Sequence, residues 1–127
     1  MRAVVLMLAA AAYLLAGCGT TKQFEAIPPG LDRATVPARV VTISARDYEF
    51  VPDTVRVQAG TLLTLRVTST DGTHGFALGA FGIDERLEEG RTKDIELFAG
   101  HRGVYPFKCS HFCGLGHFGM NGVLLVE

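Results

Sequence analysis

The sequence has no excess of charge of either sign and no polybasic tract. Lysine and arginine together number 12, against 13 aspartate and glutamate residues, which leaves a formal net charge of −1. This balance gives no support to nucleic-acid binding or to electrostatic attachment to a membrane. The chain also lacks a phosphate-binding loop and the serine, histidine and acid spacing of hydrolases, so nothing suggests catalysis on a substrate.

Long hydrophobic runs are absent except near the N-terminus. There Arg2 precedes an apolar run over residues 3–16, and Gly17 and Cys18 follow, which is the layout of a secretion signal. The segment LAGC, which ends at Cys18, resembles the bacterial lipobox, in which the cysteine is acylated once the leader is removed. We therefore expect residues 1–17 to be a lipoprotein signal peptide and Cys18 to carry the lipid.

The alternative for this segment is an uncleaved single-span anchor, although a spanning helix needs roughly 20 apolar residues. Both interpretations place the folded part in an oxidising, extracytoplasmic space, on the periplasmic face of a membrane or at the cell surface.

Sulfur is scarce, with three cysteines and three methionines in the chain. Met1 and Met7 belong to the leader, and Cys18 is assigned to the lipid. The remaining sulfur atoms, those of Cys109, Cys113 and Met120, all fall in one segment, CSHFCGLGHFGM, at residues 109–120.

Residues 18–39 contain three prolines and no hydrophobic period, so we expect a flexible tether between the lipid and a single domain over residues 40–127. Segments rich in β-forming residues and separated by turn residues predict strands in this domain, with Val41, Ile43 and Ala45 sharing one face. The predicted strands cover residues 40–50, 54–60, 61–70, 91–98, 104–108 and 122–127. Short strands at about ten-residue spacing are typical of an antiparallel sandwich or a Greek-key barrel. Residues 82–90 are the one helical candidate, and we interpret this acidic stretch as a solvated loop.

The segment at 109–120 has the spacing of a ligand set. Cys109, Cys113 and His117 are four residues apart, and Met120 follows three residues later. The glycines of this segment argue against a helix, because each costs about 1 kcal/mol relative to alanine. A loop folded back between two strands would instead direct several side chains at one centre.

Thiolate and thioether are soft ligands and imidazole is borderline, a combination that suits copper. Zinc fits less well, because structural zinc sites use cysteine and histidine without a thioether. A Cys109–Cys113 disulfide is the other extracytoplasmic possibility, but it would close a very small loop and leave His117 and Met120 unexplained.

The segment is similar to the copper loop of cytochrome c oxidase subunit II and nitrous oxide reductase, whose pattern is C-x3-C-x3-H-x2-M. That family takes a further histidine from an earlier strand end, and His74, in GTHGFAL, stands 35 residues before Cys109. The resemblance covers residues 40–127. It implies an all-β fold, a cupredoxin-like Greek-key β-sandwich or barrel.

The resemblance also implies a copper A centre with two copper ions. Cys109 and Cys113 would bridge both ions, while His74 and His117 would each cap one. Met120 would be a weak axial ligand of one ion and the backbone carbonyl of His111 that of the other. We interpret the His111 side chain as exposed, rather than as a spare ligand or a proton acceptor.

Other aromatic and imidazole side chains have no assigned role as ligands. Four phenylalanines would either line an apolar wall beside the ions or serve as core aromatics of the sandwich: Phe76, Phe107, Phe112 and Phe118. His101 has no place in the pattern, and we interpret it as a turn residue.

Three features depart from an ordinary oxidase subunit. His111 stands where that family typically has a glutamate that helps to hold magnesium. The sequence contains no tryptophan, whereas the oxidase family receives electrons from cytochrome c at an aromatic patch with tryptophan. The expected mature chain also lacks the two spanning helices that dock the oxidase subunit.

The resulting hypothesis is a membrane-anchored electron carrier without catalytic activity of its own. It would pass single electrons from a redox donor such as cytochrome c to a reductase or oxidase. One alternative is a subunit II-like component at which electrons enter a cytochrome c oxidase, and another is a copper-binding or delivery protein. Delivery would favour an exposed site for one cuprous ion, whereas electron transfer needs two buried ions in a rigid loop.

Overall fold

Nine β-strands and two short 3-10 helices make up the part of the chain that the computed structural model describes, residues 24–127. The strands are β1 (Ala38–Arg46), β2 (Glu49–Val51), β3 (Thr54–Val57), β4 (Thr61–Ser69), β5 (His74–Leu78), β6 (Ile83–Leu87), β7 (Thr92–Ala99), β8 (Gly103–Lys108) and β9 (Asn121–Val126). The 3-10 helices are η1 (Gly79–Phe81) and η2 (His117–Gly119). Within residues 24–127, no helix has the length and apolar character to cross a membrane.

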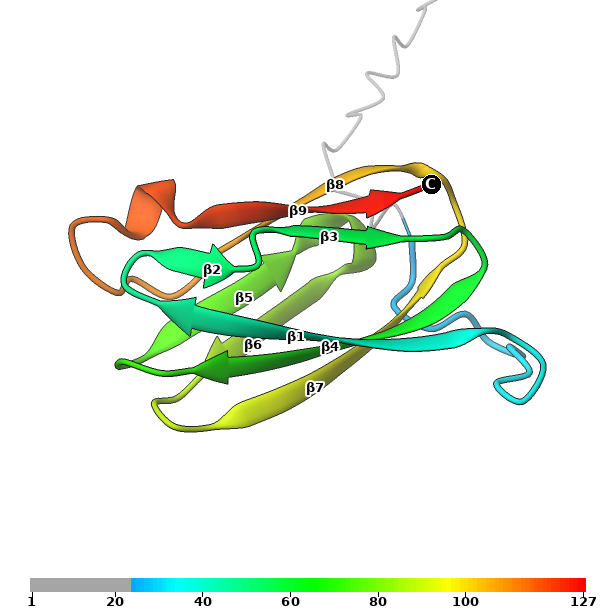
Figure 1. Ribbon diagram of the computed structural model, residues 1–127, viewed down its shortest axis with the longest axis horizontal. Coiled ribbons are helices and arrows are strands. Elements are labelled where there is room, and N and C mark those ends of the chain that lie inside the picture. The colour runs from blue at the N-terminus through cyan, green and yellow to red at the C-terminus, as the bar shows by residue number, and fades with distance from the viewer. Residues whose placement is uncertain (1–23) are drawn as a thin grey trace, which may run out of the picture.

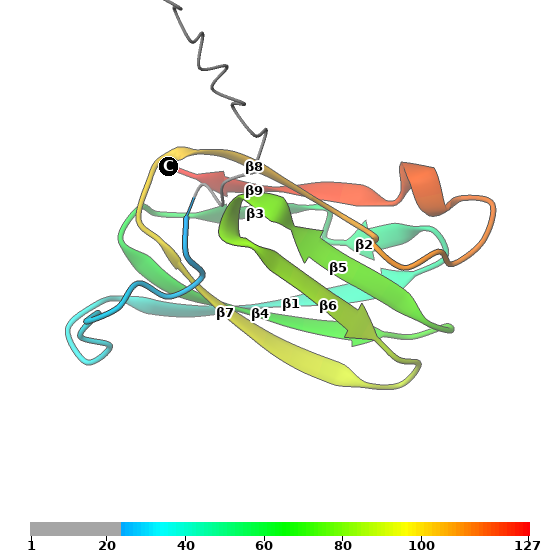
Figure 2. The same cartoon turned by 180° about the vertical axis from the view of Figure 1, so that it is seen from behind.

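The strands form two sheets that pack face to face (Figure 1). One has the order β2-β1-β4-β7 and the other β3-β9-β8-β5-β6. Figure 2 shows the second sheet from its own side, with β5 and β6 in front. This arrangement confirms the predicted all-β sandwich. Most pairs are antiparallel as predicted, but β1 runs parallel to β4, and β3 runs parallel to β9.

The core is built mainly from residues that alternate along the strands, with the inward-facing ones buried. In β4, Leu63, Leu65 and Val67 are fully buried, and β7 places Leu97 and Ile95 opposite the first two of them. Each such side chain contributes roughly 1.5–3 kcal/mol when it leaves water. The predicted inward face of residues 40–50 is confirmed at Ile43 and Ala45, which are also fully buried.

Two strands, β5 and β6, lie outside the six predicted segments. The loop interpretation of residues 82–90 is wrong over β6, because Ile83 and Leu87 are buried and the whole strand pairs with β5. Asp84 and Arg86 alternate with them and are exposed. The charged residues that suggested a loop therefore occupy the outer face of a strand.

Residues 24–37 contain no strand or helix, yet their first residues pack on the sandwich. The Phe24 N–H donates to the Ala80 carbonyl over 2.8 Å, and the Phe24 ring stacks on His101 with centroids 4.7 Å apart. This differs from the free tether expected over residues 18–39, because an aromatic side chain at position 24 finds an apolar surface near the start of β8. Residues 18–23, the expected signal peptide and the expected lipid site at Cys18 lie outside the described residues.

Candidate metal centre

Sheet pairing brings two distant parts of the chain together at one end of the sandwich. Strand β5 begins at His74, and the antiparallel strand β8 ends at Lys108, directly before Cys109. The loop between β8 and β9 projects at this end, while the segment that begins at Phe24 lies at the other (Figures 1 and 2). The N–H of Cys109 donates to the Met120 carbonyl over 2.9 Å, which closes the base of the loop.

The two cysteines lie side by side without a bond between them. Their sulfur atoms are 3.6 Å apart, and both are free thiols, whereas a disulfide needs about 2.05 Å. Cys109 is buried and Cys113 half-buried. The Cys109 thiol donates to the His111 carbonyl over 3.1 Å, so this backbone oxygen is directed toward the sulfur pair.

The other two residues of the loop pattern surround Cys113. Its sulfur lies 3.7 Å from His117 Nδ1 and 3.9 Å from Met120 Sδ. His117 begins η2 and is half-buried, while Met120, directly after η2, is 1 % exposed. The glycine-rich loop therefore brings the two thiols, a thioether and an imidazole close together.

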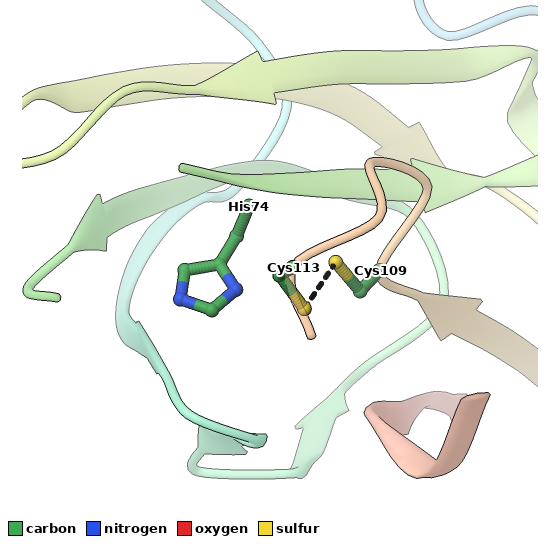
Figure 3. Close-up of side chains that lie close together, drawn as sticks. All are labelled: His74, Cys109 and Cys113. Carbon is green, nitrogen blue, oxygen red and sulfur yellow. Dashed lines mark hydrogen bonds between the residues drawn. The ribbon is translucent and has the colours of Figure 1, made fainter. Parts of the chain in front are cut away.

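His74, the first residue of β5, completes the cluster. Its side chain is fully buried, and Figure 3 shows its imidazole beside Cys113 and Cys109. A ligand atom from each of the three residues lies within 4.8 Å of the others. His74 Nε2 lies 2.8 Å from Asp71 Oδ1, but Nδ1 is buried and has no hydrogen-bond partner among residues 24–127.

This donor set fits a soft or borderline metal ion. A buried ring nitrogen without a partner is costly, and a metal bond would satisfy it. Two thiols, two imidazoles and a thioether are the ligand types that copper prefers.

The titratable groups of the site respond to burial and to one another. Burial, the neighbouring Cys109 sulfur and the Asp47 carboxylate raise the pKa of Cys113 to about 12. Metal binding must therefore displace a firmly held thiol proton. Burial acts to raise the pKa of Asp71, but the Asp47 N–H, His74 and Arg46 together outweigh it and lower that pKa below its usual range.

Three glycines allow close approach around the loop. A Cβ on Gly75 would lie 2.6 Å from the backbone nitrogen of His111. Gly114, with φ of +132°, and Gly116 both lie against the ring of Tyr48, where a Cβ would overlap it. The loop is thus packed between β5 and the turn that carries Tyr48.

The structure brings all the predicted ligands together: His74, Cys109, Cys113, His117, Met120 and the carbonyl of His111. The His111 side chain is half-buried rather than exposed. His101 lies in the bend between β7 and β8, as predicted. The sequence interpretation did not include Asp71, Asp47 and Tyr48, although an aspartate three residues before His74 was a usable signal.

The four phenylalanines divide into two groups. Phe76 and Phe107 are buried core aromatics, with ring centroids 4.9 Å apart. Phe112 and Phe118 are 63 % and 87 % exposed, so a core role is wrong for them. The ring centroids of Phe112 and Phe118 lie 5.5 Å and 5.1 Å, respectively, from the centroid of the His117 ring.

The chain belongs to the family described as Cupredoxin-like domain, which matches residues 6–126. This membership confirms the predicted fold class.

Among relatives of known identity, the chain is similar to cytochrome c oxidase subunit 2 of Thermus thermophilus, with 28% identity over 87 residues, 68% of this chain and 64% of the relative. The chain thus spans less than two thirds of the length of that relative. Among solved structures it is similar to a heme-copper terminal oxidase dimer, with a TM-score of 0.68, 25% identity and coverage of 76% of this chain and 69% of the other.

The periplasmic domain of subunit II of cytochrome oxidase of Bradyrhizobium japonicum has the same fold, with a TM-score of 0.64 at 20% identity over 69% of this chain and 83% of that domain. These matches confirm the resemblance to oxidase subunit II. Together with the family, they support copper binding and a role in electron transfer.

Proposed function

We propose that this chain is an extracytoplasmic electron carrier that holds two copper ions in a copper A centre. The observation that carries the proposal is the position of His74. Its buried imidazole, whose Nδ1 has no hydrogen-bond partner within residues 24–127, lies against the cysteine pair of a loop 35 residues further along the chain. Delivery of one cuprous ion would not need a second, fully buried histidine.

Each residue has a distinct task in this proposal. Cys109 and Cys113 would supply the two thiolates, and the 3.6 Å separation of their sulfur atoms supports this role. His74 and His117 would each hold one ion. Met120 Sδ, 3.9 Å from the Cys113 sulfur, and the His111 carbonyl, 3.1 Å from the Cys109 sulfur, would be the weaker ligands.

When bound, the two copper ions would supply one-electron redox chemistry. The protein would keep their surroundings nearly unchanged between redox states, because its ligands come from a loop that is hydrogen-bonded at its base and packed against β5. Phe76 and Phe107, each two residues from a ligand in the sequence, are buried and would exclude water from the inner side of the site.

The exposed side of the loop suits a redox partner. Phe112, Leu115 and Phe118 are 63 %, 97 % and 87 % exposed, and exposed apolar groups of this kind mark interaction sites. We propose that a donor such as cytochrome c, or an oxidase or reductase acceptor, docks over this surface beside His117. The names of the relatives favour an oxidase as one partner.

The proposed location follows from the N-terminal sequence and from the relatives. Residues 1–17 would be removed as a signal peptide, and lipidated Cys18 would hold the domain at an extracytoplasmic membrane surface. The related Bradyrhizobium japonicum domain is described as periplasmic, which favours the same side of the membrane here.

A second candidate is a subunit II-like component of a cytochrome c oxidase, favoured by the identity of the sequence relatives. It uses the same centre but requires a stable complex with an oxidase. Copurification of the chain with a haem-bearing complex would support this candidate.

The test of the centre is copper stoichiometry together with electron paramagnetic resonance on the full chain loaded with copper. We expect two copper ions per chain and a hyperfine pattern from one unpaired electron shared by both nuclei. One copper per chain, or a silent cuprous protein, would contradict the carrier and favour copper delivery. A Cys113→Ser variant should lose the shared-spin signal, whereas Ser110→Ala, in the same loop, should keep it.

A further inference from the structure

Two carboxylates lie beside the imidazole of His74, outside the proposed ligand set. Asp71 Oδ1 is 2.8 Å from His74 Nε2, while Asp47 Oδ1 is 3.6 Å from the same nitrogen. The shorter distance is that of a hydrogen bond and the longer one is not. An ionised carboxylate can only accept, so Nε2 carries the hydrogen and donates it to Asp71.

This bond decides which ring nitrogen can bind a metal ion. A neutral imidazole has one N–H and one lone pair. With the hydrogen on Nε2, the lone pair is on Nδ1, the atom that is buried without a partner among the described residues. The tautomer selected by Asp71 is therefore the one in which the unpaired nitrogen is free to bind a metal.

Asp71 is itself fixed from a second side. Its Oδ2 accepts the backbone N–H of Asp47 over 2.8 Å, which ties the β4–β5 turn to the β1–β2 turn. The next residue along that turn is Tyr48, whose ring packs against Gly114 and Gly116 of the cysteine loop. The histidine from β5 and the cysteine loop are thus held against the same turn.

We propose that Asp71 is a positioning residue that selects the Nε2–H tautomer of His74 and directs Nδ1 to the metal. The metal part of this inference rests on the proposed function. Carboxylates that hold a ligating histidine also raise its basicity, and their loss commonly weakens metal binding about 10- to 100-fold. A more basic ligand favours the more positively charged state of a metal, so loss of Asp71 should raise the reduction potential.

The experiment compares Asp71→Ala and Asp71→Asn with the wild-type full chain. In the metal-free protein, nitrogen-15 nuclear magnetic resonance of the histidine rings reports the His74 tautomer. In the copper-loaded protein, copper affinity, reduction potential and nitrogen hyperfine coupling report the ligand. We expect the Nε2–H tautomer in the wild type, its loss in Asp71→Ala, and an affinity about 10- to 100-fold lower with a raised potential.

Asp71→Asn keeps the shape and an acceptor oxygen, so it should preserve the tautomer better than alanine while still raising the potential. Two controls remove a carboxylate elsewhere. Asp47→Asn removes the charge of the carboxylate that lies 3.6 Å from His74 Nε2. Asp94→Asn removes the charge of a carboxylate on the other sheet, where it accepts a hydrogen bond from Arg66. Both should retain the wild-type tautomer, and Asp94→Asn should also retain the wild-type potential.

A folded Asp71→Ala protein with the wild-type tautomer and copper affinity would overturn the inference. Equal shifts in potential for Asp71→Asn and Asp94→Asn would also overturn it, because a general charge effect would then suffice. If the wild type binds no copper, the proposed function fails instead, and the tautomer in the metal-free variants decides whether Asp71 positions His74.

Discussion

The backbone N–H of Gly75 donates a hydrogen bond to Cys109 Sγ over 3.4 Å. This contact joins the strand that carries His74 directly to the first cysteine of the loop. It requires a residue without a side chain, because a Cβ at position 75 would lie 2.6 Å from the His111 nitrogen and would also overlap the Ser110 hydroxyl. Two of the atoms that the Cβ would meet are the backbone nitrogens of Ser110 and His111, which cannot move away as a flexible side chain can.

Gly75→Ala should therefore push the loop away from β5. We expect a loss of about 1–3 kcal/mol in the free energy of unfolding, as for other overpacked sites, and weaker copper binding. Urea unfolding and copper titration measure the two effects. Gly119→Ala is the matched control, since a Cβ there meets open space within the same loop. Equal effects of the two substitutions would contradict the close-approach argument.

Tyr48 and Gly116 should be energetically coupled, because a Cβ on Gly116 would overlap the tyrosine ring. Gly116→Ala should destabilise the wild type by about 1–3 kcal/mol and should cost less when Tyr48 is already alanine. A double-mutant cycle by chemical denaturation should give a coupling free energy of at least about 0.5 kcal/mol. Additive effects would show that the ring moves away freely, as its 39 % exposure would permit.

Met120→Leu should retain both copper ions and change the reduction potential, because a weak axial ligand tunes the potential but does not hold the site. The fold should be little affected, since exchanges between methionine and leucine usually cost less than about 1.5 kcal/mol. Voltammetry and copper analysis are the measurements. Complete loss of copper from a folded Met120→Leu protein would mean that the axial assignment is wrong.

Phe24→Ala should release the N-terminal segment from the sandwich, because its ring packs on His101, Phe81 and Tyr105. Limited proteolysis should then cut faster within residues 25–37, while the copper spectrum stays unchanged. Phe118→Ala provides the control, since that ring is 87 % exposed. Equal cleavage rates in the wild type and Phe24→Ala would argue against this anchoring contact.

Stability should fall in acid because the folded state lowers the pKa of several carboxyl groups. The Arg66 guanidinium lowers the pKa of Asp94, and Arg33 lowers that of Glu96. A lowered folded-state pKa gives stability that is complete above the unfolded value, near 4, and is lost as the pH falls through the folded value. The free energy of unfolding should thus be nearly constant from about pH 7 to 5 and should decline below about pH 4.

Arg66→Gln is the variant that isolates one of these pairs. It should lower stability slightly at neutral pH, because both partners are about half exposed and such pairs contribute little. The difference from the wild type should vanish once Asp94 is protonated. A difference that persists unchanged at about pH 2 would point to lost packing of the arginine stem instead.

The strands whose hydrophobic residues alternate could be predicted from the sequence, as Ile43 and Ala45 show. Strand β6 could not, because its five residues carry three charges and only pairing with β5 shows that Ile83 and Leu87 point inward. The parallel pairing of β1 with β4 was also hidden, since local patterns carry no information on which strands become neighbours.

The sequence by itself determined the ligand types available to a soft metal ion: two cysteines, a histidine and a methionine within residues 109–120, in a chain with the patterning of a β-sandwich. Ligand type and local spacing depend on residues that are close along the chain, so they are visible without a fold. Only the tertiary structure decided that Asp71 contacts Nε2 of His74, that Nδ1 is left without a partner in the described part of the chain, and that Tyr48 packs on the loop. Tyr48 and the loop are far apart in sequence, and the His74–Asp71 pair, although only three residues apart, meets the cysteine loop only because sheet pairing brings these segments to the same end of the sandwich.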